Sequence, residues 1–189
     1  MPVKKVSTGL EGVFLVQPDV FSDDRGYFLE TYHRAKYKES GIEYEFVQDN
    51  RSHSRHGVLR GLHYQLQNAQ GKLVYVVRGE IFDVAVDIRR GSPYFGRWFG
   101  AYLSSENSRQ IFVPEGFAHG FCVLSKTADV IYKCTDFYSP GDEYGISWSD
   151  PDIGIKWPLN SPILSQKDNG NPLLSDIPEN LLPVYCSGS

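Results

Sequence analysis

The segment "KLVYVVRGEIFDVAVDI", residues 72–88, restricts the possible folds of this chain most strongly. It contains two runs rich in β-branched and aromatic residues on either side of Gly79. Two such runs around a glycine-containing turn predict a β-hairpin. In the second run bulky apolar residues alternate with Asp83 and Asp87, and a period of two places both carboxylates on one face of the strand. The centre of the chain is therefore expected to be β-structure.

Much of the remaining chain also predicts short strands joined by turns. The 18 glycines and 11 prolines are scattered along the sequence, which indicates many turns. The spacing of the strand-like runs suits an antiparallel sandwich or barrel. Residues 31–41 are expected to form a short helix ended by Gly41, and residues 43–57 to pass from a strand into a polar, basic loop. From Asp150 onward we expect irregular structure that wraps the barrel. The other strand-like runs cover residues 97–104, 109–116, 119–125, 129–138 and 145–150.

The composition is that of one globular domain, residues 1–189, of which roughly the last 15 residues form an irregular tail. The net charge of −4 does not favour binding to nucleic acid or to an anionic membrane. No apolar stretch approaches about 18 residues, and the first residues contain no signal-peptide core. Three cysteines without a CxxC spacing predict reduced thiols and a cytoplasmic protein.

The segment "VPEGFAHGF" has a Pro-x-Gly-x-x-His spacing that ends at His119 and resembles the second motif of the cupin superfamily. In metal-binding cupins this histidine works with an H-x-H pair and a glutamate in the first motif. The corresponding region here has His63, but Gln65 stands where the second histidine is expected, and no Glu follows before Gly79. Zn and Fe(II) prefer three or four His, Cys or carboxylate ligands, so we expect no metal.

Longer blocks of the sequence resemble one particular family within this superfamily. They are "QDNRSHSRHGVLRGLHYQ", "QGKLVYVVRGEIFDVAVDIR", "SPYFGRW", "PEGFAHGF" and "YKCTDFYSPGDEYGISWSDPDIGIKWP". In register from about residue 13 to 174, they resemble the dTDP-4-dehydrorhamnose 3,5-epimerase family. The resemblance implies an all-β, cupin-type jelly-roll barrel with short peripheral helices that pairs as a homodimer. It implies epimerisation at C3 and C5 of dTDP-4-dehydro-6-deoxy-D-glucose, a step toward dTDP-L-rhamnose for cell-surface polysaccharide. No cofactor is expected, because neither a GxGxxG after a strand nor a Walker loop is present.

This reaction needs a base, an acid and a positive charge. C3 and C5 flank the C4 ketone, so their protons are acidified by enolate formation. By resemblance His63 is the base, oriented by Asp168, and an imidazole with an ordinary pKa of about 6.5 suits that role. Tyr132 is the acid on the opposite face, and Lys72 places its ammonium near the C4 oxygen. Tyr138 is the rival proton donor, because the family keeps a second tyrosine beside the sugar.

The nucleotide is expected to bind through positive charge and aromatic stacking. Arg60 matches the family's diphosphate contact, and its fork geometry suits phosphate oxygens. Arg25 and Glu30 match positions that the partner subunit contributes, to phosphate and to thymine, and Phe28 is read either as a thymine-stacking ring or as core. His119 is expected to contact the ligand, oriented by Asp83. The other matching positions in binding are Gln48, Asn50, Glu143 and Lys167.

Several other interpretations stay open at this point. Without the resemblance, His63 fits a core histidine equally well, Tyr132 an interior aromatic residue and Lys72 a solvated lysine at a strand start. The aspartates at 83 and 87 would then form a solvated strand face. Among functions, the alternatives are a C3-only or C5-only epimerase or ketoisomerase of a related dTDP-sugar, a metal cupin oxygenase, and a non-catalytic sugar-nucleotide-binding module.

Overall fold

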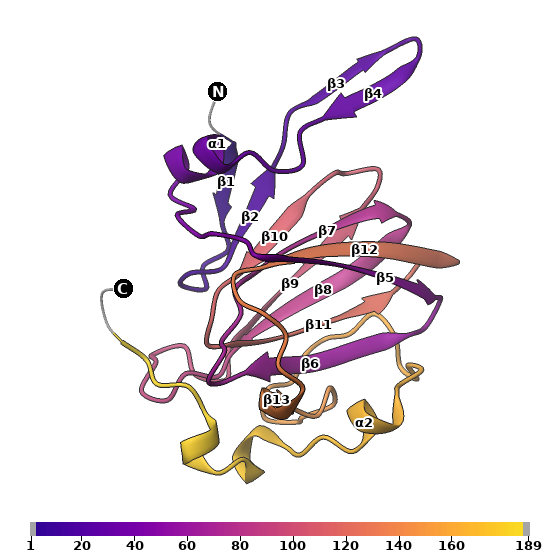
Figure 1. Ribbon diagram of the computed structural model, residues 1–189. Helices are drawn as coiled ribbons and strands as arrows, with labels where there is room; N and C mark the ends of the chain where they lie inside the picture. Colours follow the sequence, from indigo (N-terminus) through magenta and orange to yellow (C-terminus); the bar gives the residue numbers. More distant parts are fainter. Residues whose placement is uncertain (1–2, 187–189) are drawn as a thin grey trace.

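Two antiparallel sheets face each other in the computed structural model, which describes residues 3–186 (Figure 1). The predicted all-β class is confirmed, with only short helices at the periphery. The six-stranded sheet contains, in spatial order, β1 (Lys4–Ser7), β2 (Phe14–Gln17), β10 (Gln110–Val113), β7 (Lys72–Arg78), β12 (Thr127–Cys134) and β5 (Gln48–Arg55). The five-stranded sheet contains β13 (Glu143–Gly145), β6 (Leu59–Gln65), β11 (Phe117–Val123), β8 (Glu80–Asp87) and β9 (Trp98–Ser104).

The hairpin predicted around Gly79 is wrong, although both of its strands exist. Strand β7 pairs with β10 and β12, whereas β8 pairs with β11 and β9 in the other sheet. Gly79 has a φ of +82°, and a Cβ there would lie 2.1 Å from the backbone oxygen of Thr127. The glycine thus allows a sharp corner at which the chain crosses from one sheet to the other. Periodicity identified the strands, but it carries no information about their partners.

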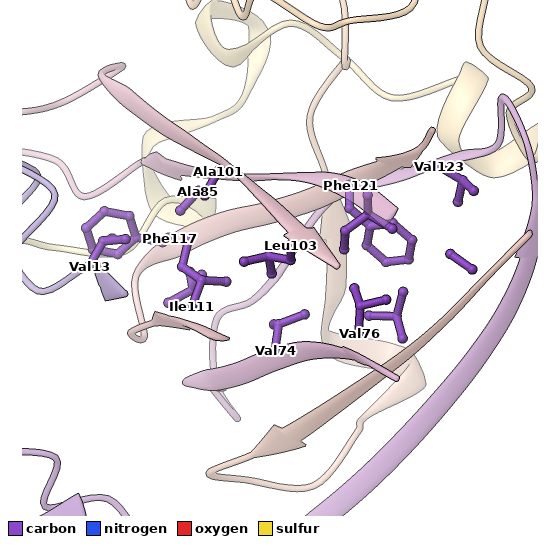
Figure 2. Packing of buried hydrophobic residues seen from close by; sticks show 14 of the residues in the cluster. Val13, Val74, Val76, Ala85, Ala101, Leu103, Ile111, Phe117, Phe121 and Val123 are labelled. Carbon is purple, nitrogen blue, oxygen red and sulfur yellow. The ribbon is translucent and has the colours of Figure 1, made fainter. Parts of the chain in front are cut away.

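Apolar side chains of both sheets pack together in part of the space between them (Figure 2). Val74 and Val76 of β7 and Leu103 of β9 belong to this core, and each is almost completely buried. Burying a side chain of this size contributes roughly 1.5–3 kcal/mol. Phe121 and Tyr132 pack in the same core and also line the cavity described below. Core packing therefore fixes part of the cavity wall.

The two aspartates of β8 are fully buried, so their interpretation as a solvated strand face is wrong. Asp87 accepts hydrogen bonds from Arg89 and from Ser92, each at 2.7 Å. Asp83 contacts His119 in the cavity wall. The alternation itself was predicted correctly, because the bulky apolar residues of β8 lie on the other face in a second core.

That second core is covered by the C-terminal segment, defined here as residues 150–186 (Figure 1). Leu174, Ile177 and Leu182 are buried in it, and the hydroxyl of Tyr64 donates to the backbone oxygen of Leu181. The expected irregular wrap is observed, and the last three residues of the expected tail lie outside the described residues. Its short helices are α2 (Gln166–Asn169), η2 (Leu174–Asp176) and η3 (Glu179–Leu181); η1 (Pro140–Asp142) precedes β13.

Near the N-terminus a two-stranded hairpin, β3 (Val20–Asp23) and β4 (Gly26–Leu29), projects away from both sheets (Figure 1). We call it the N-terminal arm. Phe28 on it is 68% exposed. Helix α1 (Arg34–Glu39) follows, and Gly41, with a φ of +78°, lies just beyond its end as predicted. No helix within residues 3–186 is long and apolar enough to cross a membrane.

The prediction for residues 43–57 is wrong in its order. Residues 43–47 form no strand, and the polar stretch expected to be a loop is β5. Along β5, half-buried Gln48, Asn50 and Ser52 alternate with exposed residues. The buried face of this edge strand is polar because it lines a cavity, so hydrophobic periodicity could not reveal it. The last predicted strand also lies earlier than expected, at β13 rather than at 145–150.

Candidate active site

A cavity of about 580 Å³ lies between the two sheets. Its walls come from β5, β6, β7, β11 and β12, from β13 and the turn before it, and from α2 with its N-cap residue. Eleven predicted site residues line it: His63, Tyr132, Asp168, Lys72, Gln48, Asn50, Arg60, His119, Tyr138, Glu143 and Lys167. Residues up to 120 positions apart in the chain, Gln48 and Asp168 for example, are thus brought together by the barrel.

Arg60 and His63 both line the cavity although they are three residues apart on one strand. A regular strand would place them on opposite faces. On the neighbouring β11, His119 is opposite His63 and Phe121 is opposite Arg60, so three steps on β6 match two on β11. This bulge turns both side chains inward.

Gly61 lies within this bulge and has a φ of +111°. A Cβ at this position would lie 2.6 Å from the backbone oxygen of His119 and 2.7 Å from Cα of Gly120. The space beside Gly61 is therefore taken by the backbone of β11.

His63 and Asp168 form a close pair in the cavity wall, with 2.5 Å between Nε2 and Oδ1. Asp168 belongs to α2, where the Ser165 side chain accepts a hydrogen bond from its backbone N–H. Burial alone would raise the pKa of Asp168, but hydrogen bonds from His63 and Ser165 hold that pKa below its ordinary value. A carboxylate is therefore held against one ring nitrogen of His63, and the rest of the ring, which lines the cavity, is partly exposed.

Tyr132 and Lys72 lie on the opposite wall, in the six-stranded sheet. Burial raises the pKa of Tyr132, with Cys134 acting in the same direction and the charge of Arg60 opposing. Burial lowers the pKa of Lys72, and Cys134 and Glu143 oppose part of that effect. The wall thus presents a phenol that burial keeps protonated and an amine whose charged form burial disfavours. The charge of Arg60 acts to lower the pKa of Tyr132, but burial outweighs it.

Tyr138, Glu143 and Lys167 form a network at the cavity. The Tyr138 hydroxyl donates to Oε2 of Glu143 at 2.7 Å, and Lys167 Nζ is 2.5 Å from the same oxygen. Burial alone would raise the pKa of Glu143, but Lys167 and Tyr138 hold it below its ordinary value. The hydrogen bond to Glu143 raises the pKa of Tyr138. Both candidate proton donors are therefore neutral phenols near neutral pH.

His119 and Asp83 form a second buried pair. Nε2 of His119 lies 3.0 and 2.9 Å from the two carboxylate oxygens of Asp83. The pairing is the one expected from the sequence. Within residues 3–186, no cluster of three or more His, Cys, Asp or Glu side chains has the geometry of a metal site.

Polar side chains of β5 form another part of the cavity wall. Gln48 donates to the amide oxygen of Asn50 at 3.0 Å, and Asn50 donates to Sγ of Cys134 at 3.6 Å. Arg60 donates through Nε to the hydroxyl of Ser54 at 3.0 Å. The guanidinium is thereby oriented beside the cavity.

Three predicted binding residues do not reach this cavity. Arg25 and Phe28 lie on the N-terminal arm, and Glu30 follows it. Arg25 pairs with Asp23 at 2.6 Å, and Glu30 pairs with Lys36 at 2.7 Å. Within one chain these residues are separate from the site, and Phe28 is not a core residue.

The family model described as dTDP-4-dehydrorhamnose 3,5-epimerase matches residues 7–176. The chain belongs to this family. The resemblance seen in the sequence is therefore confirmed, and the barrel is the cupin-like fold of these epimerases.

Individual relatives agree with this assignment. The dTDP-4-dehydrorhamnose 3,5-epimerase of Methanothermobacter thermautotrophicus is 55% identical over 184 residues, 95% of this chain and 96% of that protein. The enzyme of the same name from Neisseria gonorrhoeae is 57% identical over 164 residues, 86% of this chain but only 50% of that protein. A crystal structure of the Legionella pneumophila dTDP-6-deoxy-D-glucose-3,5-epimerase in complex with dTDP-4-keto-L-rhamnose superimposes with a TM-score of 0.96. It is 51% identical and covers 98% of this chain and 100% of that one.

Several residues that line the cavity were not predicted from the sequence. Gln65 was considered only as a missing metal ligand, yet it lines the wall two positions after His63. Strand periodicity from His63 was the available signal for it. Ser165 could have been found as the N-cap residue of a short helix. The other missed lining residues are Ser52, Tyr64, Gln70, Gly120 and Phe121.

Proposed function

We propose that this chain epimerises C3 and C5 of dTDP-4-dehydro-6-deoxy-D-glucose to give dTDP-4-dehydro-L-rhamnose. The observation that carries the proposal is the placement of the His63–Asp168 pair and Tyr132 on opposite sheets of one cavity. Epimerisation removes a proton from one face of a carbon and returns a proton to the other. A base and an acid on facing walls can act on a sugar ring held between them.

In the proposed reaction His63 takes the proton from the carbon next to the ketone. The electron pair moves onto the C4 oxygen, where the ammonium of Lys72 stabilises the developing enolate. Tyr132 then donates its proton to the opposite face of the same carbon. Proton exchange with solvent restores neutral His63 and neutral Tyr132 before the second carbon reacts.

The remaining cavity residues bind and orient the substrate in this proposal. Arg60 suits the diphosphate because a guanidinium offers paired donors to phosphate oxygens. The side-chain amides of Gln48 and Asn50 bind the nucleotide. The opposite charges of Lys167 and Glu143 neutralise each other beside Tyr138. His119, fixed by Asp83, contacts the sugar.

Incubation with dTDP-4-dehydro-6-deoxy-D-glucose in D₂O tests the function. Deuterium at both C3 and C5 is the expected result. Incorporation at one carbon would replace the proposal by a C3-only or C5-only epimerase. Tight binding of the substrate without deuterium at either carbon would favour a non-catalytic binding module. The His63→Ala variant should lose exchange at both carbons, and normal exchange in it would refute His63 as the base.

We also propose that the protein is a homodimer in which each arm completes the partner's cavity. The support is the projecting arm, on which Phe28 and the Arg25–Asp23 pair are exposed outside the chain's own cavity. Mixing the His63→Ala and Arg25→Ala variants gives the decisive test. Mixed dimers would regain one intact site, so activity above that of either variant alone is expected. Monomers by light scattering, or no recovery on mixing under exchanging conditions, would refute it.

A cytoplasmic location completes the proposal. It is supported by the free thiols of Cys122, Cys134 and Cys186. Fractionation of cells expressing the chain should place it with the cytoplasmic markers, and recovery from another compartment would refute this part.

A further inference from the structure

Gln65 uses its whole side-chain amide to bind backbone atoms. It is the last residue of β6 and only 7% exposed. Its Nε2 donates to the backbone oxygens of Asn68 at 2.6 Å and Phe137 at 3.2 Å. Its Oε1 accepts from the backbone N–H of Ser139 at 2.9 Å. The two acceptors and one donor fix the orientation of the amide, so the residue that stands in place of a metal-ligating histidine has a different task.

The two distant partners of Gln65 are the residues on either side of Tyr138. The Phe137 oxygen and the Ser139 nitrogen belong to the two peptide groups that flank this tyrosine. A second side-chain amide, that of Gln48, accepts from the backbone N–H of Tyr138 at 2.8 Å. The backbone of Tyr138 is thus held from both sides by side chains of the cavity wall.

This clamp matters because the residues around Tyr138 lie outside regular secondary structure. Strand β12 ends at Cys134, and residues 137–139 have no strand partner. Tyr138 is 50% exposed, and its phenol is fixed at the far end by Glu143. The position of the ring over the cavity therefore depends on a few side-chain hydrogen bonds rather than on a sheet.

We propose that Gln65 is a positioning residue that holds Tyr138 at the sugar-binding end of the cavity. The proposal rests on the epimerase function proposed above and adds a residue to it. Gln65 does not touch the reacting carbons; it acts by fixing the backbone on both sides of Tyr138. Loss of the amide lets the 137–139 segment move while Arg60, held by Ser54, stays in place.

The substitution Gln65→Leu removes all three hydrogen bonds at nearly constant volume. A ring misplaced by about 1 Å costs between roughly ten-fold and 100-fold in rate, so we expect a loss of that size in kcat for epimerisation. Binding of dTDP should change less than kcat, because Arg60, the proposed diphosphate contact, is held by Ser54 and not by the 137–139 segment. Hydrogen–deuterium exchange of a peptide spanning 135–139 should accelerate, because Ser139 N–H loses its acceptor.

A matched control is Gln17→Leu. Gln17 ends β2 away from the cavity, and its amide likewise donates to a backbone oxygen, that of Asn107 at 3.2 Å. Gln17→Leu should leave both kcat and exchange of the 135–139 peptide unchanged. If Gln65→Leu does not fold, Gln65→Met provides a second variant of the same length without the amide.

A double-mutant cycle separates positioning from a general structural effect. In a Tyr138→Ala background there is no ring to misplace, so Gln65→Leu should lower kcat further by less than about two-fold. An equal loss in both backgrounds would show that Gln65 does not act through Tyr138 and would overturn the proposal.

The two proposals fail in different ways. If the wild-type protein shows no exchange at C3 or C5, the epimerase function fails, and the proposed role of Gln65 falls with it. If the wild-type protein is active but Gln65→Leu keeps normal kcat or normal exchange of the 135–139 peptide, only the Gln65 proposal is overturned.

Discussion

Nε2 of His63 lies 2.5 Å from Oδ1 of Asp168, although 105 positions separate the two residues in the chain. The contact joins a strand of the barrel to a helix in the C-terminal segment. Asp168 is only 5% exposed and keeps a pKa below its ordinary value. The irregular C-terminal segment therefore does more than cover the core, because it brings a carboxylate to the imidazole.

The first prediction concerns Asp168→Asn. The amide keeps the shape of the side chain but removes the charge that orients His63 and stabilises its protonated form. Since general acid–base catalysis contributes between roughly 100-fold and 10,000-fold, we expect kcat to fall within that range. Steady-state kinetics and C3/C5 exchange measure the loss. Asp152→Asn, an exposed change in the same segment, should be neutral; a fall of less than two-fold for Asp168→Asn would contradict the expectation.

The second prediction distinguishes the acid from the base. Tyr132→Phe keeps the ring in the core but removes the phenolic proton, so His63 can still form the enolate. Product formation should therefore fall more than deuterium exchange into the unreacted substrate. Proton NMR in D₂O follows both in one sample. Equal losses of exchange and inversion would argue that the donor is another group, with Tyr138 the next to be changed to Phe.

The third prediction uses the lowered pKa of Lys72. Burial disfavours the ammonium, so Lys72 loses its charge as pH rises through a value below its ordinary pKa of about 10.4. The alkaline limb of the kcat profile should therefore have its midpoint below that value. Lys72→Arg keeps the charge throughout this range, so its kcat should be lower but should lack this limb. An unchanged alkaline limb in Lys72→Arg would assign the titration to another group.

Strand positions were the part of the fold that the sequence predicted best. The alternation in β8 placed Asp83 and Asp87 on one face correctly, because a period of two reports the geometry of a single strand. It could not report that the chain changes sheet at Gly79, since strand pairing is decided by packing across the barrel. Strand β5 was missed for a related reason: Asn50 and Ser52 face a polar cavity, so no apolar pattern marks the strand.

Only part of the candidate site could be predicted from the sequence. Nothing local links His63 to Asp168, and only the resemblance to a family paired them. Arg25 lies outside the chain's own cavity because the β3–β4 hairpin projects from the barrel. The sequence does not show the path of this hairpin. In the sequence, Gln65 stood out only because it occupies the position where a metal-ligating histidine is expected. Its hydrogen bonds to the residues flanking Tyr138 depend on a loop whose course no sequence pattern predicts.

The fourth prediction concerns the anchor at the base of the arm. The buried hydroxyl of Tyr37 lies 2.7 Å from Oε1 of Gln110 and 2.9 Å from the backbone oxygen of Thr31. Tyr37→Phe leaves the Gln110 oxygen, in a residue 1% exposed, without this donor. An unsatisfied buried group costs about 1–3 kcal/mol, and urea unfolding should show a loss of that size. Tyr102→Phe, at a side chain 50% exposed, should change stability by less than about 0.5 kcal/mol.

The fifth prediction concerns Gly61, between Arg60 and His63 on the bulged strand. With a φ of +111°, an alanine there is strained, and its Cβ would lie 2.6 Å from the backbone oxygen of His119. Neither backbone can yield easily, because β6 and β11 are both central strands of the sheet. We expect Gly61→Ala to lower the free energy of unfolding by roughly 3 kcal/mol or more, measured by urea denaturation.

The matched control for this change is Gly141→Ala. Gly141 lies in η1, has no positive φ, and a Cβ there would meet nothing within 4 Å. It should cost less than about 0.5 kcal/mol. A Gly61→Ala protein as stable as Gly141→Ala would mean that β6 and β11 can separate. The close approach of β6 and β11 at Gly61 would then not be what fixes the bulge that turns Arg60 and His63 toward the cavity.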